Sequence, residues 1–227
     1  MVILQRNPFY AIRAVIFDMD GTLIDSMDLY HAIIRDLVET LGVRMIISRE
    51  LLFESLSQGK KLSDIIFSPD MENREKTVEQ FNTLAIRSFK EVFARGEVEL
   101  IDGVNGLFEN LRQRGFSLAI VTSSITEVVV PFLKAKNLHS HLNCVLGRSE
   151  ARRLKPFPDP LLKCMKILNV APSESVYVGD SIIDIQAGKA AGVRTVGVLT
   201  GATDLNRLRA ETPDVILDSV GDLPSVL

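Results

Sequence analysis

The feature that most constrains the fold is an alternation of short apolar segments with helical patterns along most of the chain. Each apolar segment has the length of a buried strand, and the residues after it show apolar positions at helical spacing. The predicted strands are residues 14–17, 118–121, 144–146, 176–178, 195–198 and 215–217, and the predicted helices between them run through 107–115, 128–136, 160–168, 182–191 and 205–210. This alternation indicates an α/β fold, a Rossmann-like parallel sheet with helices on both faces.

The segment between the first strand and the rest of the chain is helical in pattern. Apolar residues recur at helical spacing from Tyr30 to Leu41, and Gly42 ends that run. Ser48 is a plausible N-cap for a short second helix, and a long amphipathic pattern runs from Val78 to Phe93. We therefore expect residues 26–97 to form an inserted all-helical domain, with residues 1–25 and 98–227 forming the α/β core.

Composition excludes several classes of protein. Hydrophobic residues make up 46% of the chain, which is enough for a large core. With 26 basic and 29 acidic residues the net charge is −3, so the basic excess of a general nucleic-acid binder is missing. The sequence has neither an apolar run near 18 residues nor a signal-peptide pattern. These observations predict a cytoplasmic protein that binds neither nucleic acid nor membrane.

Polar side chains follow several predicted strands directly. Asp18 and Asp20 follow the first strand, Thr122 and Ser123 follow the second, and Asp180 follows a later one. In open α/β sheets, ligands bind beyond the carboxyl ends of the strands. We therefore expect these side chains to meet at one edge of the sheet.

The carboxylates at this edge suggest a cation site. Asp18 and Asp20 are two residues apart, so on an extended strand they point the same way, and Gly21 permits a sharp turn after them. Asp180 and Asp184 fall one turn apart on the predicted helix. Oxygen ligands of this kind suit Mg²⁺. Each pair also has a plain structural explanation, a surface turn for the first and helix capping for the second.

Lys155 lies in a loop, residues 152–160, that three prolines stiffen. A lysine held beside acidic groups could neutralise a phosphoryl group and an attacking carboxylate. In isolation the residue could equally be a solvated surface lysine.

Four motifs occur in a fixed order, FDMDGTL, VTSS, LKPFPDP and GDSIIDIQAGKAAG. Together they resemble those of the haloacid dehalogenase superfamily of phosphohydrolases, in particular its phosphoglycolate phosphatase-like branch, and the resemblance runs from Ala14 to Leu217. It implies a catalytic core domain and a helical cap domain at residues 26–97 that selects the substrate. The implied activity is hydrolysis of a small-molecule phosphomonoester by a Mg²⁺-dependent phosphatase. The second motif differs from the VTN form common in phosphoglycolate phosphatases, which leaves the substrate open among phosphoglycolate, sugar phosphates, nucleoside monophosphates and pyrophosphate.

The resemblance also implies a role for each motif residue. Asp18 would be the nucleophile that forms an aspartyl-phosphate, and Asp20 would be the general acid and then the general base. Thr122 would hydrogen-bond the phosphoryl oxygens and Lys155 would balance their charge. The remaining implied roles are metal binding by Asp180, Asp184, the Asp18 carboxylate and the Asp20 carbonyl, and substrate binding by Gly21, Ser123 and the cap loop with Gly59 and Lys60.

Three other functions remain as alternatives. A phosphosugar mutase of the same fold would use the same Asp18 and Asp20 but return the phosphate to a sugar. A dehalogenase needs neither a metal nor an acid two residues after the nucleophile, so Asp20 argues against it. A non-catalytic binding protein would keep the fold without phosphorylation of Asp18. The sequence leaves the choice between monomer and homodimer open.

Overall fold

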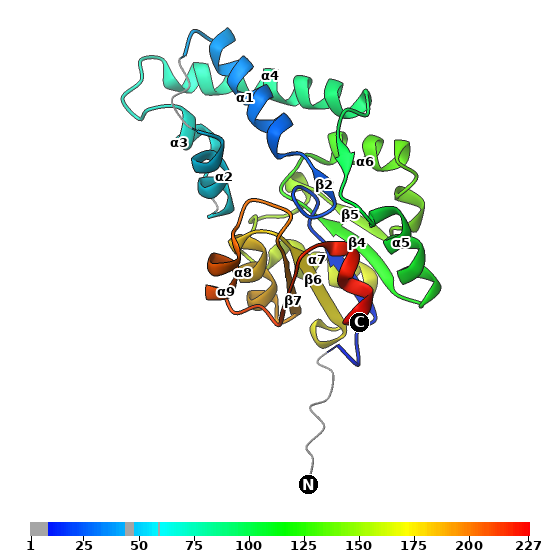
Figure 1. Cartoon of the computed structure of the whole chain (residues 1–227). Helices are drawn as coiled ribbons and strands as arrows, with labels where there is room; N and C mark the ends of the chain where they lie inside the picture. Colours follow the sequence, from blue (N-terminus) through cyan, green and yellow to red (C-terminus); the bar gives the residue numbers. More distant parts are fainter. Residues whose placement is uncertain (1–8, 44–47, 59) are drawn as a thin grey trace.

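The computed structural model describes residues 9–43, 48–58 and 60–227 (Figure 1). Its centre is a six-stranded parallel sheet with the strand order β5-β4-β1-β6-β7-β8. The strands are β1 (Ala14–Phe17), β4 (Ser117–Val121), β5 (Cys144–Leu146), β6 (Ser175–Gly179), β7 (Arg194–Val198) and β8 (Val215–Leu217). All six strands were expected from the sequence, and the predicted α/β fold is confirmed.

Helices cover both faces of the sheet because successive residues of each buried strand point to opposite sides. Phe17 packs on one face, where it stacks on Phe108 at 5.3 Å between ring centroids and shares a hydrophobic cluster with Val129. Ile16 packs on the other face in a cluster with Met165. The core helices are α5 (Val104–Gln113), α6 (Thr126–Ala135), α7 (Asp159–Leu168), α8 (Ile182–Ala191) and α9 (Leu205–Ala210), with short 3-10 helices η1 (His139–His141), η2 (Arg148–Glu150), η3 (Pro172–Glu174) and η4 (Val220–Ser225).

Within the described residues, four helices lie between the first strand and the rest of the core, and Figure 1 shows them together on one side of the sheet. We call this segment, residues 26–97, the helical insertion. The Ser48 side chain accepts a hydrogen bond from the Leu51 N–H, which confirms the predicted N-cap. Tyr30 and Phe89 pack their rings 4.3 Å apart between centroids. The helices are α1 (Met27–Thr40), α2 (Arg49–Ser57), α3 (Leu62–Ile66) and α4 (Arg74–Ala94).

A two-stranded ribbon flanks the helical insertion, and sequence patterns did not predict it. Strand β2 (Ile24–Asp25) pairs antiparallel with β3 (Glu99–Leu100). Each strand has two residues, which is too short for an alternating pattern to be visible. The ribbon joins the two places where the chain passes between the core and the helical insertion.

Among the helices of the described ranges, none combines the length and the apolar character needed to cross a bilayer.

Candidate active site

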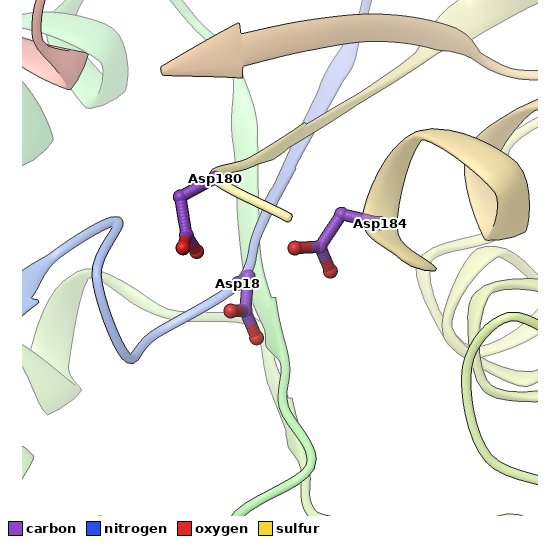
Figure 2. Close-up of side chains that lie close together, drawn as sticks. All are labelled: Asp18, Asp180 and Asp184. Atoms are coloured by element: carbon purple, nitrogen blue, oxygen red, sulfur yellow. The ribbon is translucent and has the colours of Figure 1, made fainter. Parts of the chain in front are cut away.

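Three carboxylates converge at the carboxyl edge of the sheet. Figure 2 shows the side chains of Asp18, Asp180 and Asp184 close together, and each offers an oxygen within 4.8 Å of the others. Asp18 follows β1, Asp180 follows β6, and Asp184 lies in the first turn of α8. All three are buried, with at most 6% of their surface exposed. Asp18 and Asp180, two of the residues expected at this edge of the sheet, therefore lie together there.

Strand pairing and small residues bring these side chains together. Strands β1 and β6 are neighbours, and the Asp18 N–H donates to the Val178 carbonyl at 2.8 Å. Gly21 has a φ of +76°, and a Cβ there would lie only 2.7 Å from Asp180 Oδ2. A Cβ on Gly201 would overlap the same carboxylate. At these two positions, only glycine lets the backbone approach Asp180 so closely.

Lys155 is buried at the centre of the cluster. Its Nζ donates hydrogen bonds to Asp18 Oδ1 at 2.7 Å, to Asp184 Oδ1 at 2.6 Å and to the Tyr177 hydroxyl at 3.1 Å. Burial alone would lower the pKa of Lys155, but the two carboxylates outweigh it and raise the pKa above its ordinary value. The lysine is thus held as an ammonium ion between two acids.

The Asp184 carboxylate is almost fully occupied by protein donors. Its Oδ2 accepts from both the N–H and the hydroxyl of Ser181, which caps α8. Its Oδ1 accepts from Lys155 and lies 3.0 Å from the Tyr177 hydroxyl. A carboxylate has about four lone-pair sites. Asp184 is therefore placed to orient Lys155 and the start of α8, with little capacity left for a direct metal bond.

Asp180 and Asp18 keep more lone pairs that can accept a hydrogen bond or bind a ligand. Asp180 accepts from the Thr22 hydroxyl at 3.1 Å and from the Ala202 N–H at 2.9 Å. In the described part of the chain, the Asp18 side chain accepts one hydrogen bond, from Lys155. These two carboxylates can therefore offer further oxygen lone pairs to a ligand.

The electrostatics of the cluster suit a divalent cation. Three carboxylates against one ammonium leave a formal excess of two negative charges when all are ionised. Burial, and then the Asp184 carboxylate, raise the pKa of Asp180 to about 7. Burial also raises the pKa of Asp18 well above its ordinary value, although Lys155 opposes this. The carboxylates of this buried site resist full ionisation unless a cation is present. Their oxygen atoms are ligands of the kind that Mg²⁺ prefers, so the site fits that ion.

Asp20 has separate surroundings, and its carboxylate is not part of the acidic cluster. Its Oδ1 accepts from the Ser26 hydroxyl at 2.8 Å and its Oδ2 from the Ser124 hydroxyl at 2.6 Å. Burial raises the pKa of Asp20, and the two serine hydroxyls partly oppose that rise. A carboxyl group with a raised pKa is suited to give up and take back a proton during a reaction.

The remaining predicted residues are less closely joined to the cluster. Thr122 is buried, and its hydroxyl accepts from the Ser124 N–H at 3.0 Å, while Ser123 is partly buried. The Gly21 N–H already donates to the Ile24 carbonyl, so its visible role is steric. Lys60 is exposed and lines a cavity of about 370 Å³ between α2 and α3. Gly59 lies outside the described residues.

Sequence reasoning missed several polar residues that hold the site. Ser124 belongs to the VTSS motif, but only the two residues before it were assigned a role. Thr22 and Ser26 follow the first motif closely, and their hydroxyl groups were the available signal. Tyr177 and Tyr30 were interpreted only as apolar members of a strand and a helix, because their hydroxyl partners come from distant parts of the chain.

A family model described as haloacid dehalogenase-like hydrolase matches residues 15–198. The pyrophosphatase PpaX of Anoxybacillus flavithermus is 32% identical, and the match covers 95% of this chain and 97% of that protein. The phosphoglycolate phosphatase of Escherichia coli is 31% identical, with 96% of this chain and 93% of that protein covered.

Solved structures agree on the fold. A haloacid dehalogenase-like hydrolase from Bacteroides fragilis superposes with a TM-score of 0.81 at 24% identity. The match covers 93% of this chain and 99% of that one. At this identity the likeness shows the fold, including the helical segment.

Proposed function

The chain belongs to the haloacid dehalogenase-like hydrolases, and on that premise we propose that Asp18 takes a phosphoryl group from a small-molecule phosphomonoester with the help of Mg²⁺. Its relatives make it a phosphatase, a phosphoric monoester hydrolase. The metal, the aspartyl-phosphate and the residue roles are the proposed part.

The observation that carries the proposal is that Asp18 lies beside both a buried ammonium and a second carboxylate. Lys155 donates to one oxygen of Asp18, and Asp180 offers an oxygen within 4.8 Å of an oxygen of Asp18. Asp18 and Asp180 would hold Mg²⁺, together with the Asp20 carbonyl predicted from the sequence, while Asp184 would act by orienting its neighbours. When bound, the cation would neutralise phosphoryl oxygens and reduce their repulsion with the Asp18 carboxylate.

Asp18 would attack phosphorus with its carboxylate and form the aspartyl-phosphate. Lys155, fixed by Asp184 and Tyr177, would stabilise the negative charge that spreads over the phosphoryl oxygens in the transition state. Thr122 and the Ser123 N–H would donate hydrogen bonds to the same oxygens, since both follow β4 at the same edge of the sheet.

Asp20 would transfer the protons of the reaction. As an acid it would give a proton to the departing alkoxide, so that the alcohol leaves neutral. As a carboxylate it would then take a proton from the water that attacks the aspartyl-phosphate. The raised pKa of Asp20 supports the first of these roles because it favours the protonated form more than in an ordinary aspartate.

The helical insertion, residues 26–97, would act as a cap that excludes water and selects the substrate. We place Lys60, with Gly59 beside it in sequence, on the substrate side as a partner for an anionic group of the leaving alcohol. Phosphoglycolate is the first substrate to test, because a relative at 31% identity carries that name. Pyrophosphate is the second, from the relative at 32% identity.

The test is phosphate release from a panel of phosphorylated metabolites that includes both compounds, with Mg²⁺ and with a chelator. We expect release that requires Mg²⁺ and disappears in Asp18→Asn. Asp25→Asn is the matched control, since Asp25 is an exposed aspartate in β2 outside the acidic cluster. Transfer of phosphate between sugar positions without net release would favour the mutase alternative, and full activity in Asp18→Asn would overturn the nucleophile.

A further inference from the structure

Tyr30 is connected to Asp20 through a single serine hydroxyl. The Ser124 hydroxyl donates to Asp20 Oδ2 at 2.6 Å, and the Tyr30 hydroxyl lies 3.0 Å from the same Ser124 oxygen. Both distances are within the ordinary range for hydrogen bonds between oxygens. The three residues come from α1, the loop after β4 and the loop after β1.

The direction of the chain of hydrogen bonds follows from counting hydrogens. A serine hydroxyl has one hydrogen, and here the Asp20 carboxylate accepts it. Tyr30 must then donate to Ser124. A donor to the serine oxygen polarises its O–H group and strengthens the bond to the carboxylate. Tyr30 therefore acts on Asp20 through Ser124, and its hydroxyl also lies near the Asp20 carboxylate itself.

The helical insertion carries this tyrosine and fixes its ring. Tyr30 belongs to α1, and its ring packs on Phe89 of α4 with 4.3 Å between centroids. Burial, and then the nearby Asp20 carboxylate, raise the pKa of Tyr30 well above its ordinary value. The hydroxyl thus remains a donor across the working pH range.

We propose that Tyr30 is a positioning residue that orients the Asp20 carboxyl group through Ser124, so that placement of the helical insertion controls protonation of the leaving alcohol. This inference rests on the proposed function, in which Asp20 is the general acid. Ser26 holds the other oxygen of Asp20 from the start of the helical insertion. Tyr30 joins the loop after β4 to the helical insertion.

The chemistry predicts which substrates depend on Tyr30. An alkyl phosphate releases a strongly basic alkoxide, which needs the proton from Asp20 as the P–O bond breaks. p-Nitrophenyl phosphate releases a stable phenolate and needs little help. Loss of the Tyr30 hydroxyl should therefore harm the first substrate more than the second.

The experiment compares Tyr30→Phe with the wild type on an alkyl phosphate and on p-nitrophenyl phosphate, measuring kcat and KM for each. The phenylalanine keeps the ring against Phe89 and removes only the hydroxyl. We expect kcat/KM to fall about tenfold for the alkyl phosphate, near the upper end for loss of one hydrogen bond between neutral groups, and less than about twofold for p-nitrophenyl phosphate. Tyr10→Phe is the matched control, because Tyr10 is 90% exposed.

A double-mutant cycle tests the route through Ser124. If Tyr30 acts mainly through that hydroxyl, Tyr30→Phe should cost much less in a Ser124→Ala background than in the wild type. Equal losses on the two substrates, or additive losses in the cycle, would mean a structural role and would overturn the inference. A wild-type protein inactive on every phosphomonoester would instead count against the proposed function, so the two failures are distinguishable.

Discussion

Lys155 and Asp184 form a buried ion pair, with 2.6 Å between Nζ and Oδ1, even though the loop and the helix that carry them are separate in sequence. The same ammonium lies 2.7 Å from Asp18 Oδ1. The pair therefore ties the proposed nucleophile to the first turn of α8. This relationship explains why a site with three acids can form in the folded chain.

Lys155→Ala should destabilise the protein as well as inactivate it. The substitution leaves the Asp18 and Asp184 carboxylates buried without their cation, and breaking such a pair costs about 3 kcal/mol or more. Urea unfolding in the presence of a chelator measures this loss. Lys166→Ala, at an exposed position of α7, is the control and should change stability by less than about 0.5 kcal/mol. Equal effects of the two substitutions would contradict the importance of the pair.

The stability of the metal-free protein should depend on pH through Asp180. The folded pKa of about 7 lies above the ordinary value of 3.8, so the folded state holds this proton more tightly than the unfolded chain does. The stabilisation is complete below pH 4 and is lost as the pH rises through 7. Asp180→Asn should therefore have a Tm at pH 8 at least ~3 °C above that of the wild type, when both are measured with a chelator.

Added Mg²⁺ should reverse this order. The cation would neutralise the wild-type cluster and raise its Tm, whereas Asp180→Asn lacks one of the proposed ligands. A wild-type Tm that does not respond to Mg²⁺ at pH 8 would count against the metal site.

Asp180 and Asp184 should differ in their effect on metal affinity. Asp184 already accepts hydrogen bonds from Ser181 and Lys155, while Asp180 retains free lone pairs. We expect Asp180→Asn to weaken Mg²⁺ binding at least about fivefold more than Asp184→Asn, within the range found for direct ligands and their orienting neighbours. Titration calorimetry with Mg²⁺ alone measures both affinities. Equal losses would indicate that both carboxylates bind the cation directly.

Gly201→Ala should lower activity by displacing Asp180. A methyl group at this position would overlap the Asp180 carboxylate, so the side chain would have to leave its hydrogen bond with the Ala202 N–H. Activity measured against Mg²⁺ concentration should show a higher requirement for the metal. The control is Gly106→Ala in α5, where nothing lies within 4 Å of the new Cβ. That variant should be fully active and more stable by up to about 1 kcal/mol.

The sequence predicted the core well because each of its elements leaves a local pattern. The six strands are buried apolar segments, and Gly42, with a φ of 71°, marks a helix end that was predicted from the glycine after an apolar pattern. The β2–β3 ribbon could not be predicted in this way. Its pairing joins residues far apart in the chain, and two residues carry no periodicity.

The site likewise contains residues with a local sequence signal and residues without one. Motif residues such as Asp18 and Lys155 were named from the sequence, and the structure brings them together. Tyr30 and Tyr177 were not predicted to be site residues, since a tyrosine on an apolar face looks like a core residue until its hydroxyl partner is known. The predicted division into a core and a cap domain, and the cap roles of Gly59 and Lys60, remain predictions.

The β2–β3 ribbon has a mechanical consequence. Because the outgoing and returning strands are hydrogen-bonded to each other, they cannot twist independently where the chain enters and leaves the helical insertion. Any movement of the helical insertion would then carry both strands together. Such a restriction would return Tyr30 to the same place beside Ser124 in every turnover.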